Sequence, residues 1–231
     1  MKGVVLFAFL SVFAIKGYSQ GSSTYGIFGG AGLATSNNYD YGLSYGFSYV
    51  KGVQNHMGLG ITIFSQGYSL YYDNEANSAK HGLGTEGFTL RHVSNYIFVA
   101  PKVTRDLGSK GYLKFYVNAG VGFLMSGYDS VRKWKLANDP TYANHFDSTI
   151  DASDNVNKMV LRVGLGFTQH LHLSNGWWFT VSEDLGFLPG SLTKTGDANN
   201  NNPSRTPYSP PKINPGYISL HIGISRHKAA R

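Results

Sequence analysis

From about residue 20 onward, large apolar or aromatic residues alternate with small or polar ones along most of the chain. The clearest case is the segment 41–49, in which every odd position is Tyr, Leu or Phe and every even position is Gly or Ser. A period of two predicts β-strands, because successive side chains of a strand point to opposite faces. No window shows a convincing helical stripe, so the sequence predicts an all-β protein.

The alternation predicts eight strands. It is clear in four segments, and weaker copies of it lie between them. The clear segments are 41–49, 113–126, 159–168 and 217–225, and the weaker ones are 24–35, 57–71, 90–105 and 177–187. All of these segments reach the ~9–11 residues that a tilted strand needs to cross a membrane.

The composition of the second face indicates which face meets water. A soluble sheet would carry Lys and Glu there, but this face is mostly Gly, Ser, Thr and Asn, and only 14% of the residues are charged, against ~25% in soluble domains. Small and polar residues suit the interior of a narrow barrel, and the apolar row would then face lipid. In hydrocarbon, a sheet must close on itself because unpaired backbone groups are costly.

The connections agree with a barrel whose N-terminus is periplasmic. The inner turns would be 51–56, 106–110 and 172–176, and the outer loops 36–40, 72–87, 128–157 and 188–215, three of which are long as outer-membrane barrels require. Aromatic residues gather at the predicted interfaces, as Tyr112, Trp177 and Trp178 on the inner side and Tyr41, Tyr71, Tyr72, Tyr128 and Tyr217 on the outer side.

The first residues have the pattern of an export signal. Lys2 precedes an apolar run over 3–14 and a small-x-small site over 17–19, which predicts a signal peptide over 1–19 and a barrel domain over 20–231. The run is shorter than the ~20 residues of a membrane-spanning helix, which disfavours an N-terminal anchor. Removal of the signal leaves 18 basic and 13 acidic residues, a net charge of +5, and the absence of Cys excludes a lipoprotein anchor and disulfides.

Several polar residues share the inward parity of the predicted strands. We expect them to form a polar plug that closes the lumen, since buried charges must be paired or hydrogen-bonded; a proton or substrate site is the alternative. They are Lys102, Lys114, Tyr116, Asn118, Arg162, Asp184 and His221. Strict alternation would place Glu183 on the lipid face, so we predict either a bulge near Ser182 that turns it inward or a position near the rim.

Three motif matches are expected to be structural. Gly42–Gly46 fits G-x-S-x-G, but its alternation continues where a nucleophile elbow would turn into a helix. The segment 82–87 fits G-x-G-x-x-G, but it follows a polar run and precedes a strand, which favours a surface loop. His170 and His172 share a face but lack a third metal ligand nearby. We therefore predict no catalytic, cofactor or metal site.

The outer loops are candidates for partner binding. The loop 128–157 mixes acidic residues with Arg132, Lys133, Trp134 and Lys135, which could dock a partner; a mobile polar loop is the alternative. No basic stripe with interleaved aromatic residues indicates nucleic acid binding.

Five segments carry a resemblance to a known family. They are 58–68 (GLGITIFSQGY), 95–106 (NYIFVAPKVTRD), 114–127 (KFYVNAGVGFLMSG), 163–167 and 217–225, and together they resemble the PorT-like outer-membrane β-barrel domain family of Gram-negative envelopes. Two features depart from that family. Val99 and Ala100 stand where an acidic residue is usual, and the chain ends with Arg226–Arg231 rather than on the aromatic residue that helps outer-membrane barrels to assemble. The resemblance implies an outer-membrane location, and one branch of the family is associated with protein secretion.

The resulting expectation is an eight-stranded, antiparallel, up-and-down transmembrane β-barrel of OmpA/OmpX size with long extracellular loops. It would lie in the outer membrane of a Gram-negative bacterium, contact lipid, and serve a non-enzymatic structural or protein-interaction role, with secretion proteins among the candidate partners and no cofactor. The alternatives are an enzyme that acts on lipid or peptide, for which His81, His92 and His145 are the histidines at the outer rim, and a secreted soluble barrel that carries a ligand. A pore is disfavoured because side chains about fill an eight-stranded barrel. The sequence leaves the oligomeric state open.

Overall fold

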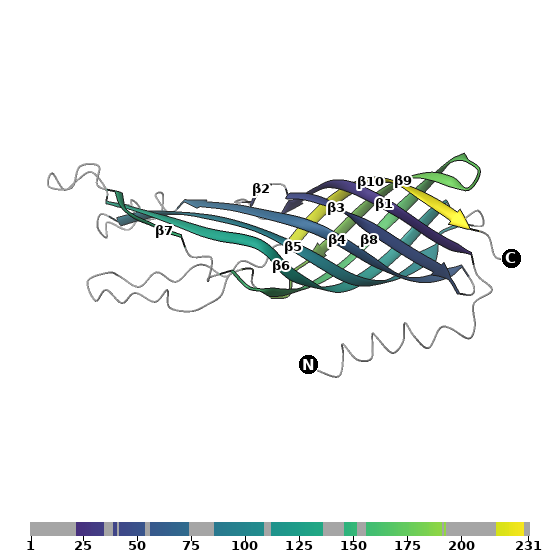
Figure 1. Cartoon of the computed structure of the whole chain (residues 1–231), viewed down its shortest axis with the longest axis horizontal. Coiled ribbons are helices and arrows are strands. Elements are labelled where there is room, and N and C mark those ends of the chain that lie inside the picture. Colours follow the sequence, from purple (N-terminus) through teal and green to yellow (C-terminus); the bar gives the residue numbers. More distant parts are fainter. Residues whose placement is uncertain are drawn as a thin grey trace, which may run out of the picture.

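The protein is a closed antiparallel β-barrel (Figure 1). The computed structural model describes residues 22–34, 39–40, 42–53, 56–73, 86–108, 112–135, 146–151, 156–190, 192 and 216–228. Its strands are β1 (Ser23–Ala34), β2 (Tyr39–Asp40), β3 (Gly42–Gly52), β4 (Met57–Asp73), β5 (Glu86–Asp106), β6 (Leu113–Lys135), β7 (Phe146–Asp151), β8 (Met159–Ser174), β9 (Trp177–Phe187) and β10 (Gly216–Lys228). Within these residues, no helix is long and apolar enough to cross a membrane.

Eight of the described strands form the ring, in the order β1, β3, β4, β5, β6, β8, β9 and β10. The first and last strands close it, since β1 pairs with β10 from Ser23 opposite Lys228 to Ala34 opposite Tyr217. Every neighbour in the ring is also a neighbour in sequence along the barrel strands, which makes an up-and-down barrel. The predicted fold class, an eight-stranded antiparallel barrel, is confirmed. The last strand runs to Lys228, beyond its predicted end at residue 225.

At the outer end, β5 and β6 extend furthest beyond the strands that the alternation predicted. β5 begins at Glu86 and β6 ends at Lys135, and the two stay paired up to that point, with Glu86 opposite Lys135. β7 adds to the edge of β6, and β2 adds to β4. Figure 1 shows this sheet projecting beyond the barrel at the end away from β1's start. The segments 86–87 and 128–135, expected in outer loops, are therefore strand.

The two ends of the barrel differ in their connections. We call the end with Ser23, Lys228 and the short turns the inner end, and the opposite end the outer end. At the inner end, Asn175 and Gly176 join β8 to β9 with φ of 45° and 80°. Two central residues with positive φ, in an Asn-Gly pair, are typical of the type I′ turn that joins antiparallel strands tightly.

The outward face of the barrel is an apolar surface. Alternate residues of all eight barrel strands are large, hydrophobic and exposed, including Ile27 at 67%, Leu43 at 68% and Met125 at 67%. Soluble monomers rarely expose contiguous apolar patches above a few hundred Å². Other members of this belt are Phe47, Ile63, Val103, Val117, Phe123, Leu161, Leu165, Phe167, Leu171, Leu185, Phe187, Ile218, Leu220, Ile222 and Ile224.

Glu183 interrupts this belt. Its side chain is exposed, and its residue lies opposite Phe167 of β8 and Leu220 of β10. The pairing of β9 is regular at Ser182, and the only register shift between β8 and β9 in the described residues lies at His172 and Ser174. The predicted bulge near Ser182 is therefore wrong, because both neighbouring strands keep β9 in strict alternation. The rim alternative is also wrong, since Glu183 is the neighbour of Asp184, whose buried carboxylate forms an ion pair with Arg162 inside the barrel.

Candidate functional site

The centre of the lumen is organised around Arg162, whose side chain is 2% exposed. Its Nη1 donates to Asn118 Oδ1 at 2.9 Å, and its Nη2 donates to Asp184 Oδ2 in a buried ion pair. The guanidinium also lies over three aromatic rings, 4.5 Å from the Tyr217 centroid, 4.7 Å from the Phe64 centroid and 5.9 Å from the Phe98 centroid. A planar, delocalised cation suits such a site because it pairs with a carboxylate and stacks on rings at the same time.

The other predicted plug residues occupy different levels of the same lumen. Lys114 Nζ donates to Asp106 Oδ1 at 2.8 Å, near the inner end, where both side chains are about one-fifth exposed (19% and 22%). Lys102 Nζ lies 3.7 Å from the centroid of the Tyr116 ring. The His221 ring meets Phe28 edge-on, with the centroids 5.0 Å apart. The structure thus brings Asn118, Arg162 and Asp184 into one cluster and leaves Lys114 in a separate pair.

The outer half of the lumen is filled by aromatic side chains that are not among the predicted plug residues. Phe64 stacks on Phe98 at 5.2 Å between centroids, and Tyr68 and Tyr96 meet edge-on at 6.1 Å. All four are at most 5% exposed, and Leu188 and Leu192 complete this cluster. Their inward orientation could have been predicted from the sequence. In the alternation, Phe64 lies on the same face as Thr62, and Phe98 lies on the same face as Ala100.

Glycines on the facing strands make room for these rings. A Cβ at Gly122 would collide with the Phe98 ring, and a Cβ at Gly164 would lie 2.6 Å from the Tyr217 hydroxyl oxygen. Tyr217 itself is 2% exposed and points inward. Its predicted place in the outer aromatic belt is therefore wrong, because it shares its parity with His221. Tyr41 and the side chains of Tyr71, Tyr72 and Tyr128 lie outside the described residues, and Tyr112 and Trp177 are exposed at the inner end.

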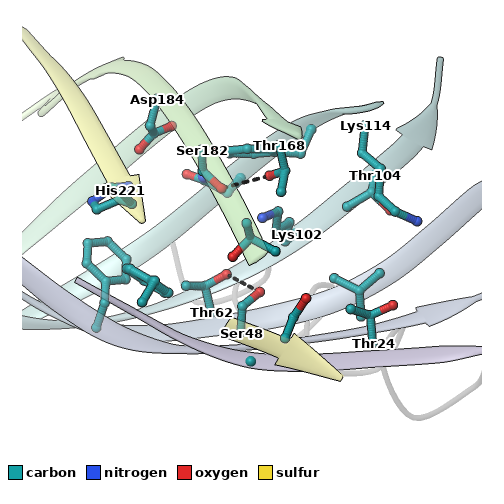
Figure 2. Close-up of a pocket in the computed structure, with 18 of the residues that line it drawn as sticks. Thr24, Ser48, Thr62, Lys102, Thr104, Lys114, Thr168, Ser182, Asp184 and His221 are labelled. Carbon is teal, nitrogen blue, oxygen red and sulfur yellow. Dashed lines mark hydrogen bonds between the residues drawn. The ribbon is translucent and has the colours of Figure 1, made fainter. Parts of the chain in front are cut away.

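The inner half of the lumen holds a polar pocket of about 90 Å³ (Figure 2). Serine and threonine side chains from seven strands line it, and four of them form the pairs Ser48–Thr62 at 3.4 Å and Thr168–Ser182 at 3.0 Å. Lys102 lies among these hydroxyl groups in Figure 2. Residues deep in the pocket, such as Arg162 and Asp184, are buried, whereas Thr24, Lys114 and His170 near the inner end are partly exposed. The pocket is therefore approached from the inner end.

The two rim histidines pack against Trp178. The His172 ring lies 4.9 Å from the indole centroid and the His170 ring 6.3 Å from it. His170 lines the pocket and His172 is exposed. In the described part of the chain, no group of three His, Cys, Asp or Glu side chains is arranged to hold a metal ion. The histidines' contacts are thus aromatic ones.

The residues of the motif matches also have structural surroundings. Ser44 of the G-x-S-x-G match lies within β3 and is 1% exposed, so the strand continues through the motif as predicted. His92 Nε2 and Ser94 Oγ lie 2.9 Å apart on β5, a pair of the kind that a hydrolase needs, but both side chains are fully buried. Residues 82–85, His81 and His145 lie outside the described residues.

The four candidate docking residues all lie on β6, where that strand pairs with β5 and β7. Arg132 is opposite Thr89 of β5 and Thr149 of β7, and Trp134 is opposite Gly87 and Phe146. The predicted loop position is therefore wrong for Arg132, Lys133, Trp134 and Lys135, because strand pairing continues into this segment. They stand on the sheet that projects from the outer end.

Fold and lumen together define the class: a closed, eight-stranded barrel with an apolar exterior and a filled interior. No family model matches the chain, and no curated protein matches it either. Among solved structures it is similar to the attachment invasion locus protein Ail of Yersinia pestis, with 9% identity, 90% of this chain and 99% of that chain covered, and a TM-score of 0.43. It is also similar to a major outer membrane protein of Thermus thermophilus (10% identity, 89% and 99% covered, TM-score 0.43) and to the outer membrane protein AlkL (16%, 93% and 94%, TM-score 0.38).

Proposed function

We propose that this chain is a non-enzymatic protein of the Gram-negative outer membrane, which spans the lipid as a barrel and contacts other envelope proteins at its outer end. One observation carries the proposal: the ring of strands is closed and presents an apolar belt around the barrel, interrupted at Glu183, while Arg162 and Asp184 form a buried ion pair inside it. This arrangement is stable in hydrocarbon, because no backbone edge is left open and no lumen charge meets lipid.

The membrane location is tested by the heat-dependent mobility of the folded barrel. The chain is expressed with its first 19 residues in a Gram-negative host, and washed outer membranes are compared by gel electrophoresis before and after boiling. We expect a mobility shift on boiling, because a closed barrel resists detergent at room temperature. Recovery in the soluble periplasm with no shift would contradict the proposal and favour a soluble ligand-carrying barrel.

The contact surface that we propose is the sheet formed by β5, β6 and β7 beyond the barrel. It carries Arg132, Lys133 and Lys135 close together in sequence, on backbone that pairs with β5 and, at Arg132 and Lys133, also with β7. A paired backbone loses less conformational entropy on binding than a free loop does. An acidic surface on an envelope protein is the partner chemistry that these cations favour.

This contact is tested by replacing the three cations with Gln and measuring chemical crosslinking to envelope proteins in intact cells. A matched control replaces Lys51, Arg226 and Lys228, three cations at the inner end, with Gln. We expect the outer-end variant alone to lose its crosslinked products while both variants keep the heat-dependent shift. Equal loss in both variants would contradict the outer-end surface.

The resemblance to the PorT-like family adds protein secretion to the proposal. If the contact serves secretion, removing the protein from its host lowers the amount of at least one protein exported to the medium, and the outer-end variant fails to restore it. Unchanged export would remove the secretion link and leave the membrane location untouched.

A further inference from the structure

We propose that the pocket in the inner half of the lumen binds a small oxyanion, with Lys102 as its charged contact. The inference goes beyond the docking role of the outer end. It depends on the closed barrel but not on any partner protein.

The charges around the pocket leave one cation without an ionic partner. Arg162 is paired with Asp184, and Lys114 is paired with Asp106. Lys102 has no ion pair or hydrogen bond to any described residue, and its ammonium group lies over the face of the Tyr116 ring. An ammonium group offers three donors. The pocket therefore has an excess of one positive charge, located on Lys102.

Buried polar atoms that line the same pocket also lack partners among the described residues. Thr104 is 2% exposed, Ser225 is 4% exposed and His221 is 7% exposed. Thr104 Oγ1, Ser225 Oγ and His221 Nε2 have no hydrogen-bond partner among the described residues. Buried polar groups normally have hydrogen-bond partners in folded proteins. These three atoms are therefore available to a bound polar ligand. Hydroxyl donors beside an ammonium are the groups that bind phosphate and carboxylate oxygens.

The same pocket includes one unpartnered acceptor. Asp184 Oδ1 lines it and lacks a hydrogen-bond partner among the described residues, although Oδ2 is paired with Arg162. A carboxylate oxygen repels a bare anion but accepts a bond from a protonated one. Hydrogen phosphate, which carries both charge and an O–H group, is therefore the probe that fits the site best.

The space and its access agree with a small soluble ion. About 10–15 Å³ of such space holds one water molecule, so a pocket of about 90 Å³ admits several waters or one small polyatomic ion. The stacked rings of Phe64 and Phe98 close the path to the outer end. A lipid headgroup, which stays attached to its chains in the membrane, has no route into this lumen. The source is a free ion on the inner side.

Calorimetric titration of the purified full-length barrel with sodium phosphate tests the site. The protein is kept in an uncharged detergent at pH 7 and low ionic strength, and each variant must first show the heat-dependent mobility shift. We expect saturable binding of one phosphate. Lys102→Met weakens it by about tenfold or more, since a charge-assisted contact is lost. The control Lys228→Met, which removes a cation of the inner rim outside the pocket, changes the affinity by less than about twofold.

A second variant keeps the test decisive if Lys102→Met fails to fold. Valine has nearly the volume of threonine but carries a methyl group in place of the hydroxyl. We expect Thr104→Val to weaken phosphate binding about fivefold. Absence of saturable binding by a heat-modifiable wild-type barrel would overturn the inference while leaving the membrane proposal standing. Equal binding by the wild type, Lys102→Met and Thr104→Val would overturn it as well.

Discussion

The two halves of the lumen are built on different physical principles. In the outer half, Phe64, Phe98, Tyr68 and Tyr96 are packed against one another and bury nearly all of their surface. In the inner half, hydroxyl groups and Lys102 surround a pocket, and several buried polar atoms lack partners in the described residues. Arg162 lies between them and touches both, through the Phe64 ring and through Asp184. A single barrel thus contains a region that supplies stability and a region that leaves room for a ligand.

The largest expected effect comes from breaking the junction between the halves. Arg162→Ala should lower the free energy of unfolding by about 3–5 kcal/mol, because it leaves the buried Asp184 carboxylate without its partner. Lys114→Ala, which opens the partly exposed pair with Asp106, should cost less than about 1 kcal/mol. Urea unfolding in detergent micelles, followed by tryptophan fluorescence, measures both variants. Equal losses would show that the central pair has no special role.

Removing an aromatic ring tests the outer half. Phe98→Ala should destabilise the barrel by about 3 kcal/mol, since it removes a buried ring that stacks on Phe64. It should also open the path along the lumen, so that planar-bilayer recordings show conductance that the wild type lacks. Thr62→Ala in the inner half is the control, expected to cost about 1 kcal/mol or less. A closed Phe98→Ala barrel would mean that other side chains seal the lumen.

Two neighbouring carboxylates sharpen the comparison between inside and outside. Glu183→Leu should stabilise the barrel in lipid by about 1 kcal/mol, because a charge on the lipid-facing surface is unfavourable. Asp184→Leu, one residue away, should destabilise the barrel by about 3 kcal/mol, because it leaves the buried Arg162 guanidinium without its ionic partner. Unfolding titrations in phospholipid vesicles compare the two. A loss of stability in Glu183→Leu would instead reveal a contact that uses this carboxylate.

The smallest effect is expected in the inner half without ligand. Thr104→Val should leave the free energy of unfolding unchanged or raise it by up to about 1 kcal/mol, because it replaces a buried hydroxyl that lacks a partner by an apolar group of similar shape. The measurement is urea unfolding in buffer free of phosphate. A clear loss of stability would show that the hydroxyl is satisfied in the empty barrel, and would weaken the case for a binding pocket.

Much of the fold was predictable because its signal is local. Alternation, clear in four segments and weaker in the other four, marked all eight barrel strands and placed Lys102, Arg162 and His221 on the inward face, which is where the structure has them. The errors occur where the signal is not local. Glu183 breaks the apolar row, and a bulge that would restore it was expected, but pairing with β8 and β10 holds β9 in register. Tyr217 was assigned by its residue type to an interface, although its parity pointed inward.

By itself, the sequence determined the number of barrel strands, their inward and outward faces, and the approximate places of the inner turns, since each depends on residues a few positions apart. Only the tertiary structure decided which inward residues meet. Arg162 of β8 reaches Asn118 of β6, Asp184 of β9 and Phe64 of β4 at one level of the lumen, and the pocket begins below them. That level depends on the tilt and stagger of strands around the closed ring. Stagger is a property of all the pairings together, so no segment read alone contains it.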